Sequence, residues 1–130
     1  LATKYAAIKL SELNLGIGPF VVGPAVERKI GVSGMSQIAI NASEFYSAEW
    51  AKQKGLFADV FDSTEILDEA VKELSDKLCG YNPEAVKHMK QMFWRGTEDW
   101  DELLMQRAKI SGELVLSQFT KEKLARFKDK

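Results

Sequence analysis

Residues 9–24 read KLSELNLGIGPFVVGP and place one carboxylate, Glu12, in an otherwise apolar run that leads into a turn rich in glycine and proline. The alternation of apolar and polar residues predicts an extended segment with Ile8, Leu10 and Glu12 on one face. Pro19 lacks a backbone donor, so this segment cannot continue as a central strand. We therefore expect a short extended segment, then a tight turn, with an acid beside that turn.

The sequence supplies few strands to pair with this segment. Leu13 and Leu15 fall on the face opposite Glu12, so the segment either buries both faces or shifts register near Glu12. The only other extended stretch expected is LFADVF, residues 56–61. Two strands do not make a stable sheet by themselves. We infer that residues 8–15 add an edge or a layer to a sheet that is supplied elsewhere.

The rest of the chain predicts helices separated by short turns. Apolar residues recur at helical spacing, most clearly over residues 66–78, where they form one stripe. Helices are expected over residues 24–30, 33–41, 48–54, 66–78, 83–95 and 98–119, with a basic helical end at 120–130. Gly31 is expected to separate the first two helices. The residues expected to cap helix N-termini are Ser47, Asp62, Asn82 and Thr97.

Composition limits the classes of function. The chain has 130 residues, 18 basic and 19 acidic side chains, and a formal net charge of −1. This length is that of one domain, and the balanced charge favours neither nucleic acid nor an anionic membrane as a partner. No apolar run is long enough to cross a bilayer. The single cysteine and the lack of a secretory signal pattern lead us to expect a cytoplasmic protein.

Residues other than Glu12 give weaker signals of chemistry. His88 is the only histidine, and no cysteine lies at metal-ligand spacing from it. Cys79 stands at a helix end and is interpreted as a small apolar residue. The mixed basic and aromatic segment 87–95 fits an amphipathic helix with solvated lysines. Glu12 is therefore the strongest candidate for a reactive group.

Glu12 has two interpretations. A carboxylic acid among apolar neighbours keeps its proton to higher pH, and can then give and take a proton near neutrality. Alternatively, Glu12 lies at a sheet edge or turn, in water or paired with Lys4 or Lys9. Structural ion pairs are commoner than catalytic acids, so spacing alone favours the second interpretation.

Several motifs occur in an order that resembles one known family. SELNLGIGPFVVGPAVERKIG (11–31) is followed by SAEWAKQKGLF (47–57), NPEAVKHMKQMF (82–93) and FTKEKLARFKDK (119–130). This order closely resembles the C-terminal half of the enoyl-CoA hydratase/isomerase (crotonase) family and covers nearly all of the chain. The resemblance implies an α/β, crotonase-like (ββα spiral) fold, of which this chain is the mainly helical C-terminal part.

The resemblance also implies an organisation in two regions. Residues 1–82 would belong to the crotonase core, and residues 83–130 would form a helical trimerisation region, so that a homotrimer or hexamer is expected. The family's N-terminal half carries the first glutamate, the oxyanion-hole donors and most of the CoA-binding surface, and this chain lacks it. That half is expected as a partner. The chain alone is expected to be inactive, since a single oxyanion donor is worth roughly 10²–10³ in rate.

The resemblance implies a role for Glu12, which matches the family's second catalytic glutamate. Two glutamates would hold one water and add it across the double bond of an enoyl-CoA thioester, in fatty acid or branched-chain amino acid breakdown. No metal or separate cofactor is implied, because coenzyme A enters as part of the substrate. Two alternatives stay open: an isomerase that uses a single glutamate, and a helical oligomerisation module without catalysis.

Further residues are implied to bind the substrate. The turn after Glu12 would form the wall of the acyl pocket, through Leu15, Gly16, Pro19 and Phe20. Side chains near the C-terminus would contact the CoA part, namely Phe119, Lys121 and Lys123. Two features depart from the family pattern. Relatives usually have P-G-x-G-G where this chain has PFVVG, which predicts a reshaped acyl pocket, and Glu122 occupies a position that is basic in relatives.

Overall fold

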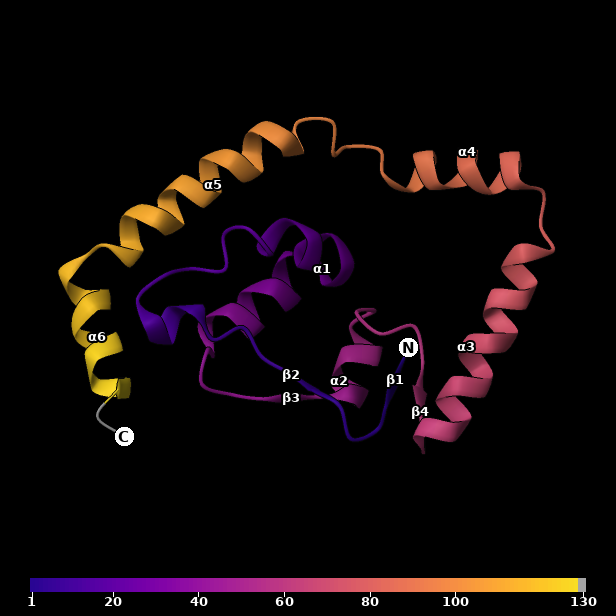
Figure 1. Ribbon diagram of the computed structural model, residues 1–130, viewed down its shortest axis with the longest axis horizontal. Helices are drawn as coiled ribbons and strands as arrows, with labels where there is room; N and C mark the ends of the chain where they lie inside the picture. Colours follow the sequence, from indigo (N-terminus) through magenta and orange to yellow (C-terminus); the bar gives the residue numbers. More distant parts are fainter. Residues whose placement is uncertain (129–130) are drawn as a thin grey trace.

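The computed structural model describes residues 1–128, which form a small α/β core (residues 1–61) and a helical arm (residues 64–128) (Figure 1). The elements of the core are β1 (Ala2–Thr3), β2 (Ala7–Ile8), the 3-10 helix η1 (Glu12–Leu15), α1 (Gly23–Ile40), β3 (Tyr46–Ser47), α2 (Ala48–Gln53) and β4 (Val60–Phe61). Those of the arm are α3 (Thr64–Cys79), α4 (Pro83–Phe93), α5 (Trp100–Val115) and α6 (Gln118–Lys128). No helix within the described residues is long and apolar enough to span a membrane.

The strands form two short ladders. β1 pairs with β4 in parallel, with Ala2 opposite Val60, and β2 pairs with β3 in antiparallel, with Ile8 opposite Tyr46. The expected extended segment is therefore right only at its start, because η1 begins at Glu12 instead of a continued strand. Ladders this short do not stabilise a sheet by themselves, as the sequence indicated.

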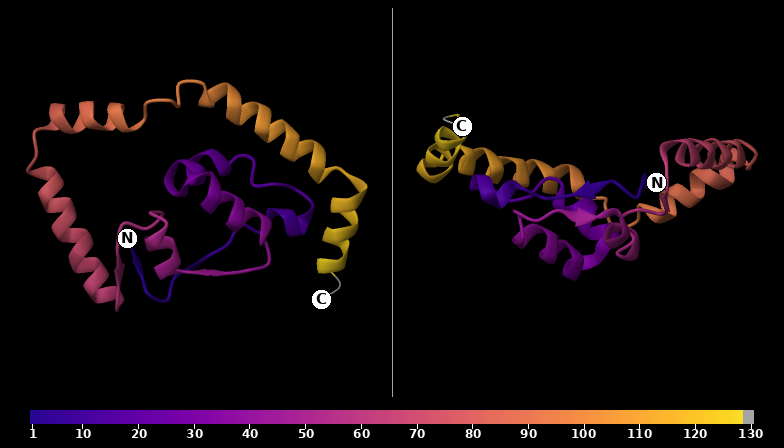
Figure 2. Two further views of the ribbon diagram at one scale, coloured as in Figure 1. Left: turned by 180° about the vertical axis from the view of Figure 1, so that it is seen from behind. Right: turned by 90° about the horizontal axis from the view of Figure 1, so that it is seen from below.

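The hydrophobic core lies between α1 and the strands. Ile30, Met35 and Ile38 of α1 are buried together, and Ile8 and Leu10 of the N-terminal segment pack against them. The separation of two helical segments at Gly31 is confirmed, since Gly31 has a left-handed φ of 69° inside α1 and kinks it. α2 and α1 lie on one side of the short strands, and α6 lies on the other (Figure 2).

Two of the four expected helix caps are confirmed. The Ser47 hydroxyl accepts a hydrogen bond from the amide of Trp50 at 3.2 Å. The Asn82 side-chain carbonyl accepts one from the amide of Glu84 at 3.0 Å. Both are short polar side chains that satisfy a free amide in the first helical turn.

The other two expected caps are wrong. Ser63, one residue later than Asp62, caps α3 by accepting from the amide of Ile66 at 3.3 Å. Asp62 forms a surface ion pair with Lys4 instead. The Thr97 hydroxyl donates backwards to the carbonyl of Trp94, and α5 starts only at Trp100. In both places the side chain that was expected to cap the helix forms a different contact.

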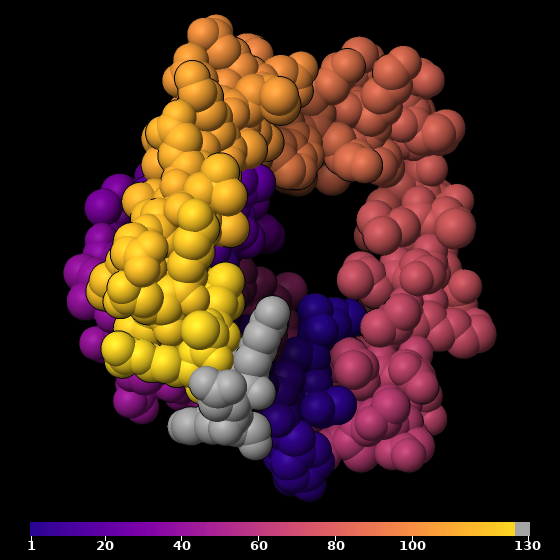
Figure 3. All heavy atoms as spheres, turned by 60° about the vertical axis from the view of Figure 1, so that its left-hand side comes forward, coloured from indigo at the N-terminus to yellow at the C-terminus, as the bar shows by residue number. Residues whose placement is uncertain are grey.

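The arm curves around the core as an arc of four successive helices (Figure 1). The single helix expected over 98–119 is broken, because α5 ends at Val115 and α6 begins at Gln118. Side-chain hydrogen bonds join the arm to the core at several points. Arg28 of α1 donates to the carbonyls of Phe93 and Arg95 at the α4–α5 junction. The space-filling view shows an open gap between core and arm (Figure 3).

The predicted apolar stripe of α3 is present but exposed. Four of its six predicted members keep 44–47% of their surface accessible, namely Ile66, Val71, Leu74 and Leu78. The other two, Leu67 and Ala70, are half-buried. No element within residues 1–128 covers the four exposed members. A stripe of this kind normally packs against another element, so α3 presents a face that requires a partner.

Candidate functional site at the Glu12 turn

Glu12 opens a single turn of 3-10 helix. The amide of Asn14 donates to the carbonyl of Ser11, and that of Gly16 donates to the carbonyl of Leu13, both at 3.1 Å. Gly16 ends the turn with a φ of 87°, a left-handed conformation that favours glycine. The amide of Ile17 then donates back to the carbonyl of Glu12 at 3.1 Å. We call residues 11–20 the Glu12 turn.

The carboxylate of Glu12 lacks the partners that a structural ion pair would give it. Its Oε2 atom is buried and has no hydrogen-bond partner among the described residues. Lys4 pairs with Asp62 at 3.1 Å, and the Lys9 ammonium lies 4.7 Å from the ring centroid of Phe45. The pairing of Glu12 with either lysine, which was one form of the alternative interpretation, is therefore wrong, whereas its expected position in a turn is right. A buried carboxylate oxygen without a partner costs free energy, and such atoms are typical of functional sites.

The segment that follows Gly16 folds into a compact turn. The amide of Gly23 donates to the carbonyl of Pro19 at 2.8 Å, which leads the turn directly into α1. The Phe20 ring lies against Gly18, where an added Cβ atom would be 2.5 Å from the ring. Arg107 of α5 donates to the carbonyl of Phe20 at 3.4 Å. Three of the predicted acyl-pocket residues, Gly16, Pro19 and Phe20, thus lie in one compact turn beside half-buried Leu15.

Helix α6 brings C-terminal residues to this turn. A Cβ atom at Gly16 would lie 2.6 Å from both the Phe119 ring and the Thr120 hydroxyl, so only glycine fits there. The Lys123 ammonium lies 5.7 Å from the ring centroid of Phe119. Lys121 is on the exposed side of α6. Of the three predicted CoA contacts, the structure thus joins Phe119 and Lys123 to each other and brings Phe119 against the Glu12 turn.

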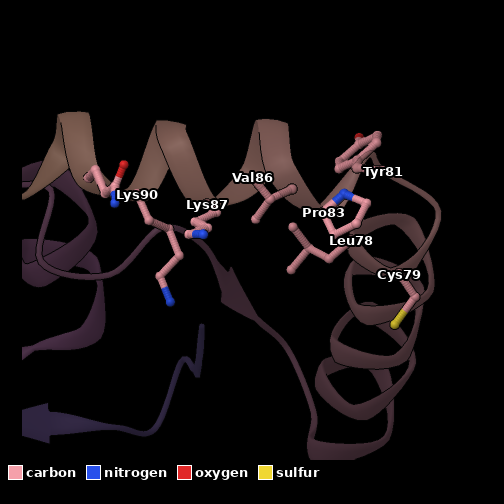
Figure 4. A pocket seen from close by; sticks show the side chains of 8 residues that line it. Leu78, Cys79, Tyr81, Pro83, Val86, Lys87 and Lys90 are labelled. Atoms are coloured by element: carbon pink, nitrogen blue, oxygen red, sulfur yellow. The ribbon is translucent and has the colours of Figure 1, made fainter.

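A separate surface groove lies where α3 meets α4. It has a volume of about 580 Å³ and apolar walls with lysines at one end, as Figure 4 shows. Its lining residues are Leu78, Cys79, Tyr81, Pro83, Val86, Lys87, Lys90 and Gln91. None of them is a predicted site residue, so this groove is not part of the Glu12 turn. Within residues 1–128 no three His, Cys, Asp or Glu side chains are grouped in a way that could hold a metal ion.

Comparison with known proteins settles the family. The sequence model for enoyl-CoA hydratase/isomerase matches residues 1–130. The chain belongs to the enoyl-CoA hydratase/isomerase family. The resemblance found in the motifs is therefore confirmed. No curated protein sequence matches the chain.

Solved structures of the family share the fold of this chain. An enoyl-CoA hydratase/isomerase from Pseudoalteromonas atlantica matches with a TM-score of 0.86 and 19% identity, over 98% of this chain and 51% of its own. An enoyl-CoA hydratase from Mycobacterium avium matches with a TM-score of 0.87 and 19% identity, over 98% and 49%. A carnitinyl-CoA dehydratase from Mycobacterium avium matches with a TM-score of 0.81 and 19% identity, over 98% and 51%.

These matches confirm the predicted α/β crotonase-like fold, of which this chain is a mainly helical part. The chain spans about half the length of the enoyl-CoA hydratase/isomerase structures that it matches. The division into regions 1–82 and 83–130 stays a prediction, as do the roles assigned to individual residues. The last two residues of the C-terminal motif lie outside the described part of the chain.

Two residues that form hydrogen bonds in or with the Glu12 turn were not predicted from the sequence. Thr120 is 1% exposed and donates to the carbonyl of Gly16. The Asn14 side chain donates to the carbonyl of Ala42, beyond the end of α1, at 2.7 Å. Both stand within the family-like motifs, but nothing in those motifs indicates which groups they contact. Their partners are 104 and 28 residues away in sequence, so only the tertiary structure reveals them.

Proposed function

We propose that this chain supplies Glu12 as a general acid/base for the addition of water to a 2-enoyl-CoA thioester. The observation that carries the proposal is the buried, unpartnered Oε2 atom of Glu12, in a chain of the enoyl-CoA hydratase/isomerase family. An oxygen atom without a partner can form a hydrogen bond with a water molecule or a substrate atom placed next to it, and general acid/base catalysis requires such contact.

Bonds and protons balance in this reaction. Water oxygen forms a bond to the β-carbon, one water proton passes to a carboxylate, and the electron pair of the double bond moves to the α-carbon and thioester carbonyl. A carboxylic acid then returns a proton to the α-carbon, so no net proton is consumed. Glu12 takes one of these carboxyl roles, and the second carboxylate and the oxyanion donors belong to the other half of the fold. Such donors are a large part of the rate.

The proposal includes partners and binding residues. The chain spans about half of its solved relatives, which supports the other half of the fold as its obligatory partner and inactivity of the chain alone. The acyl group would lie against Leu15, Gly16, Pro19 and Phe20. The CoA part would lie near Phe119, Lys121 and Lys123. Region 83–130 would mediate trimers or hexamers, and the protein would act in the cytoplasm without a metal or separate cofactor.

A second candidate function is a helical oligomerisation module without catalysis. It is favoured by one observation, the exposed apolar stripe of α3, which requires a covering partner whether or not Glu12 reacts. An isomerase that moves the double bond would use the same Glu12 without adding water. The three candidates differ in what happens to an enoyl-CoA and in their need for the Glu12 carboxylate.

The test measures the loss of enoyl absorbance from crotonyl-CoA and from a branched enoyl-CoA. It uses the full natural polypeptide that contains this chain, as wild type, Glu12→Gln and Glu69→Gln. Glu69 is an exposed glutamate of α3 and provides the matched control. We expect Glu12→Gln to lower turnover about 10²–10⁴-fold, because the amide keeps the shape but cannot transfer the proton. Glu69→Gln should retain wild-type turnover.

Other outcomes select between the candidates. Equal rates for wild type and Glu12→Gln remove Glu12 from the mechanism. A shifted double bond without water uptake, followed by mass spectrometry in heavy water, would identify an isomerase. An intact oligomer that turns over neither substrate would leave the non-catalytic module.

A further inference from the structure

Thr120 is unusual in this chain. It is buried to 1% exposure within α6, a helix whose other described side chains are largely exposed. Burying a hydroxyl costs free energy unless it forms hydrogen bonds. Here it forms two, so the position selects a polar group for a specific set of contacts.

The contacts of Thr120 form one directed chain of hydrogen bonds. The amide of Thr120 donates to the Ser117 hydroxyl at 3.3 Å, and the Ser117 hydroxyl donates to the Thr120 hydroxyl at 3.2 Å. The Thr120 hydroxyl then donates to the carbonyl of Gly16 at 3.3 Å. Each hydroxyl both accepts and donates once, so the orientation of its hydrogen is fixed by its partners.

The carbonyl that Thr120 holds leads directly to Glu12. The carbonyl of Gly16 and the amide of Ile17 belong to the same peptide group, which is planar and rigid. That amide donates to the backbone carbonyl of Glu12 at 3.1 Å. The Gly16–Ile17 peptide is therefore held by Thr120 at one end and holds Glu12 at the other. A rotation of this peptide would break both bonds and would release the backbone carbonyl of Glu12.

We propose that Thr120 is a positioning residue for Glu12, acting through the Gly16–Ile17 peptide so that docking of α6 sets the direction of the Glu12 carboxylate. This inference rests on the proposed function, in which Glu12 transfers a proton. It adds that the helix near the C-terminus controls the catalytic turn by a hydrogen bond as well as by packing of Phe119. A side chain without the hydroxyl would leave the turn in place but would remove one of the two hydrogen bonds that fix this peptide.

The test replaces the hydroxyl without changing the shape. Thr120→Val removes it, Thr120→Ser restores it, and Thr97→Val is the matched control, because the Thr97 hydroxyl also donates to a carbonyl, at 2.7 Å, away from the Glu12 turn. Each variant is made in the full natural polypeptide. We measure hydration kinetics with crotonyl-CoA and amide hydrogen exchange at Ile17.

We expect Thr120→Val to lower kcat about 10- to 100-fold, because a displacement of about 1 Å at a reacting group costs up to ~10² in rate. KM should change less than about threefold, because the binding groups stay in place. Ile17 exchange should become faster. Thr120→Ser should recover most of kcat, and Thr97→Val should change none of these quantities. A purely structural Thr120 would lower the melting temperature but leave kcat per folded molecule unchanged, which would overturn the inference.

A double variant links the effect to Glu12. If Thr120 acts through Glu12, Glu12→Gln combined with Thr120→Val is no slower than Glu12→Gln alone, because the positioned group is already gone. Independent, multiplying losses would overturn the inference while leaving the proposed function intact. If Glu12→Gln alone keeps wild-type turnover, the proposed function fails, and the positioning role fails with it. The two failures are therefore distinguishable.

Discussion

Three side-chain hydrogen bonds of the Glu12 turn join segments far apart in sequence, whereas the ion pairs of α3 and α4 join residues three or four apart. The turn is bonded by Asn14 to Ala42, by Phe20 to Arg107 and by Gly16 to Thr120. The ion pairs of α3 and α4 are Lys72–Asp76, Lys77–Glu73 and Lys87–Glu84. Each pair lies on the surface of a single helix and is largely exposed, so each contributes little to stability.

This difference shows what each region depends on. Local pairs and caps favour the helical conformation of α3 and α4 but bury no apolar face, and helices of this length owe most of their stability to tertiary packing. The arm therefore depends on a covering partner for its tertiary stability. The Glu12 turn depends on contacts already present in the chain, and its geometry should survive changes in the outer half of the arm. Paired variants, one in the core and one in the arm, test whether the two regions are stabilised independently.

The largest expected effect is in the hydrophobic core. Ile38 is 2% exposed, and Ile38→Ala should lower the free energy of unfolding by about 2–5 kcal/mol, because it removes apolar contacts and leaves a cavity. Leu74, which is 47% exposed in the α3 stripe, provides the comparison. Leu74→Ala should cost less than about 0.5 kcal/mol in this chain alone. Urea denaturation followed by circular dichroism measures both.

The same pair of variants also tests the partner of the arm. In the complete assembly, Leu74→Ala should become clearly more destabilising, since a covered leucine loses buried contacts on truncation. An equal, small cost in both settings would contradict a covered α3 stripe. A large cost in the chain alone would contradict the exposure of Leu74.

Two glycines give the next largest contrast. Gly16→Ala forces a left-handed residue with a Cβ atom 2.6 Å from Phe119 and Thr120, and should destabilise the chain by about 1–3 kcal/mol. Gly112 lies in the interior of α5 with nothing within 4 Å of an added Cβ atom. Gly112→Ala should therefore stabilise the chain by about 0.5–1 kcal/mol.

Melting temperatures of the two glycine variants provide the measurement. Hydrogen exchange adds a local readout, because Gly16→Ala should speed exchange in α6, and Gly112→Ala should not. Similar shifts of the two melting temperatures in the same direction would contradict the close docking of α6 on Gly16.

The sequence predicted best what local signals determine. The helix that begins at Pro83 follows from a proline in the first turn after Asn82, and the kink of α1 follows from Gly31. The family could also be inferred, because its motifs lie in helix-and-turn segments that keep their order. The helix start at Pro83 and the kink at Gly31 are each decided by residues within one helical turn of one another.

The sequence predicted least well what tertiary contacts determine. Ser63 rather than Asp62 caps α3, because Lys4, 58 residues away from Asp62, takes the carboxylate. The 3-10 turn at Glu12 replaces the expected strand, and the residue after it, Gly16, accepts a hydrogen bond from Thr120, 104 residues away. A threonine in a basic helical tail has no pattern that predicts burial. The candidate acid could thus be found from the sequence, but not the groups that orient it.

The smallest expected effect concerns an ion pair of the core. Lys52 of α2 lies 2.7 Å from Asp59, just before β4, and the Asp59 carboxylate also accepts from the amide of Val60 at 2.9 Å. The hydrogen bond from Lys52, then that from Val60, hold the pKa of Asp59 below its usual value. The hydrogen bond to Asp59 raises the pKa of Lys52. Both side chains are almost half exposed, at 43% and 49%, so the contribution is small.

The two shifts set the pH window of this contribution. Asp59 has a lower pKa in the folded state, so its stabilisation is present above its unfolded pKa and is lost as the pH falls through the folded value, below about pH 4. Lys52 has a higher pKa when folded, so its part is lost only as the pH rises beyond about 10.5. Asp59→Asn should therefore lower the melting temperature slightly at pH 7 and make a progressively smaller difference as the pH falls below about 4. Added salt should shrink the difference at pH 7.

Glu73→Gln in α3 is the matched control for the arm. The hydrogen bond from Lys77 lowers the pKa of Glu73 in the same way, but this pair lies within one helix instead of joining two elements. Glu73→Gln should therefore reduce the local stability of α3, seen by hydrogen exchange, and leave the melting of the core unchanged. A destabilisation by Asp59→Asn that grows toward pH 3 would contradict the direction of the Asp59 pKa shift. An effect of Glu73→Gln on the core equal to that of Asp59→Asn would mean that arm and core unfold as one unit, against the separation that their contacts indicate.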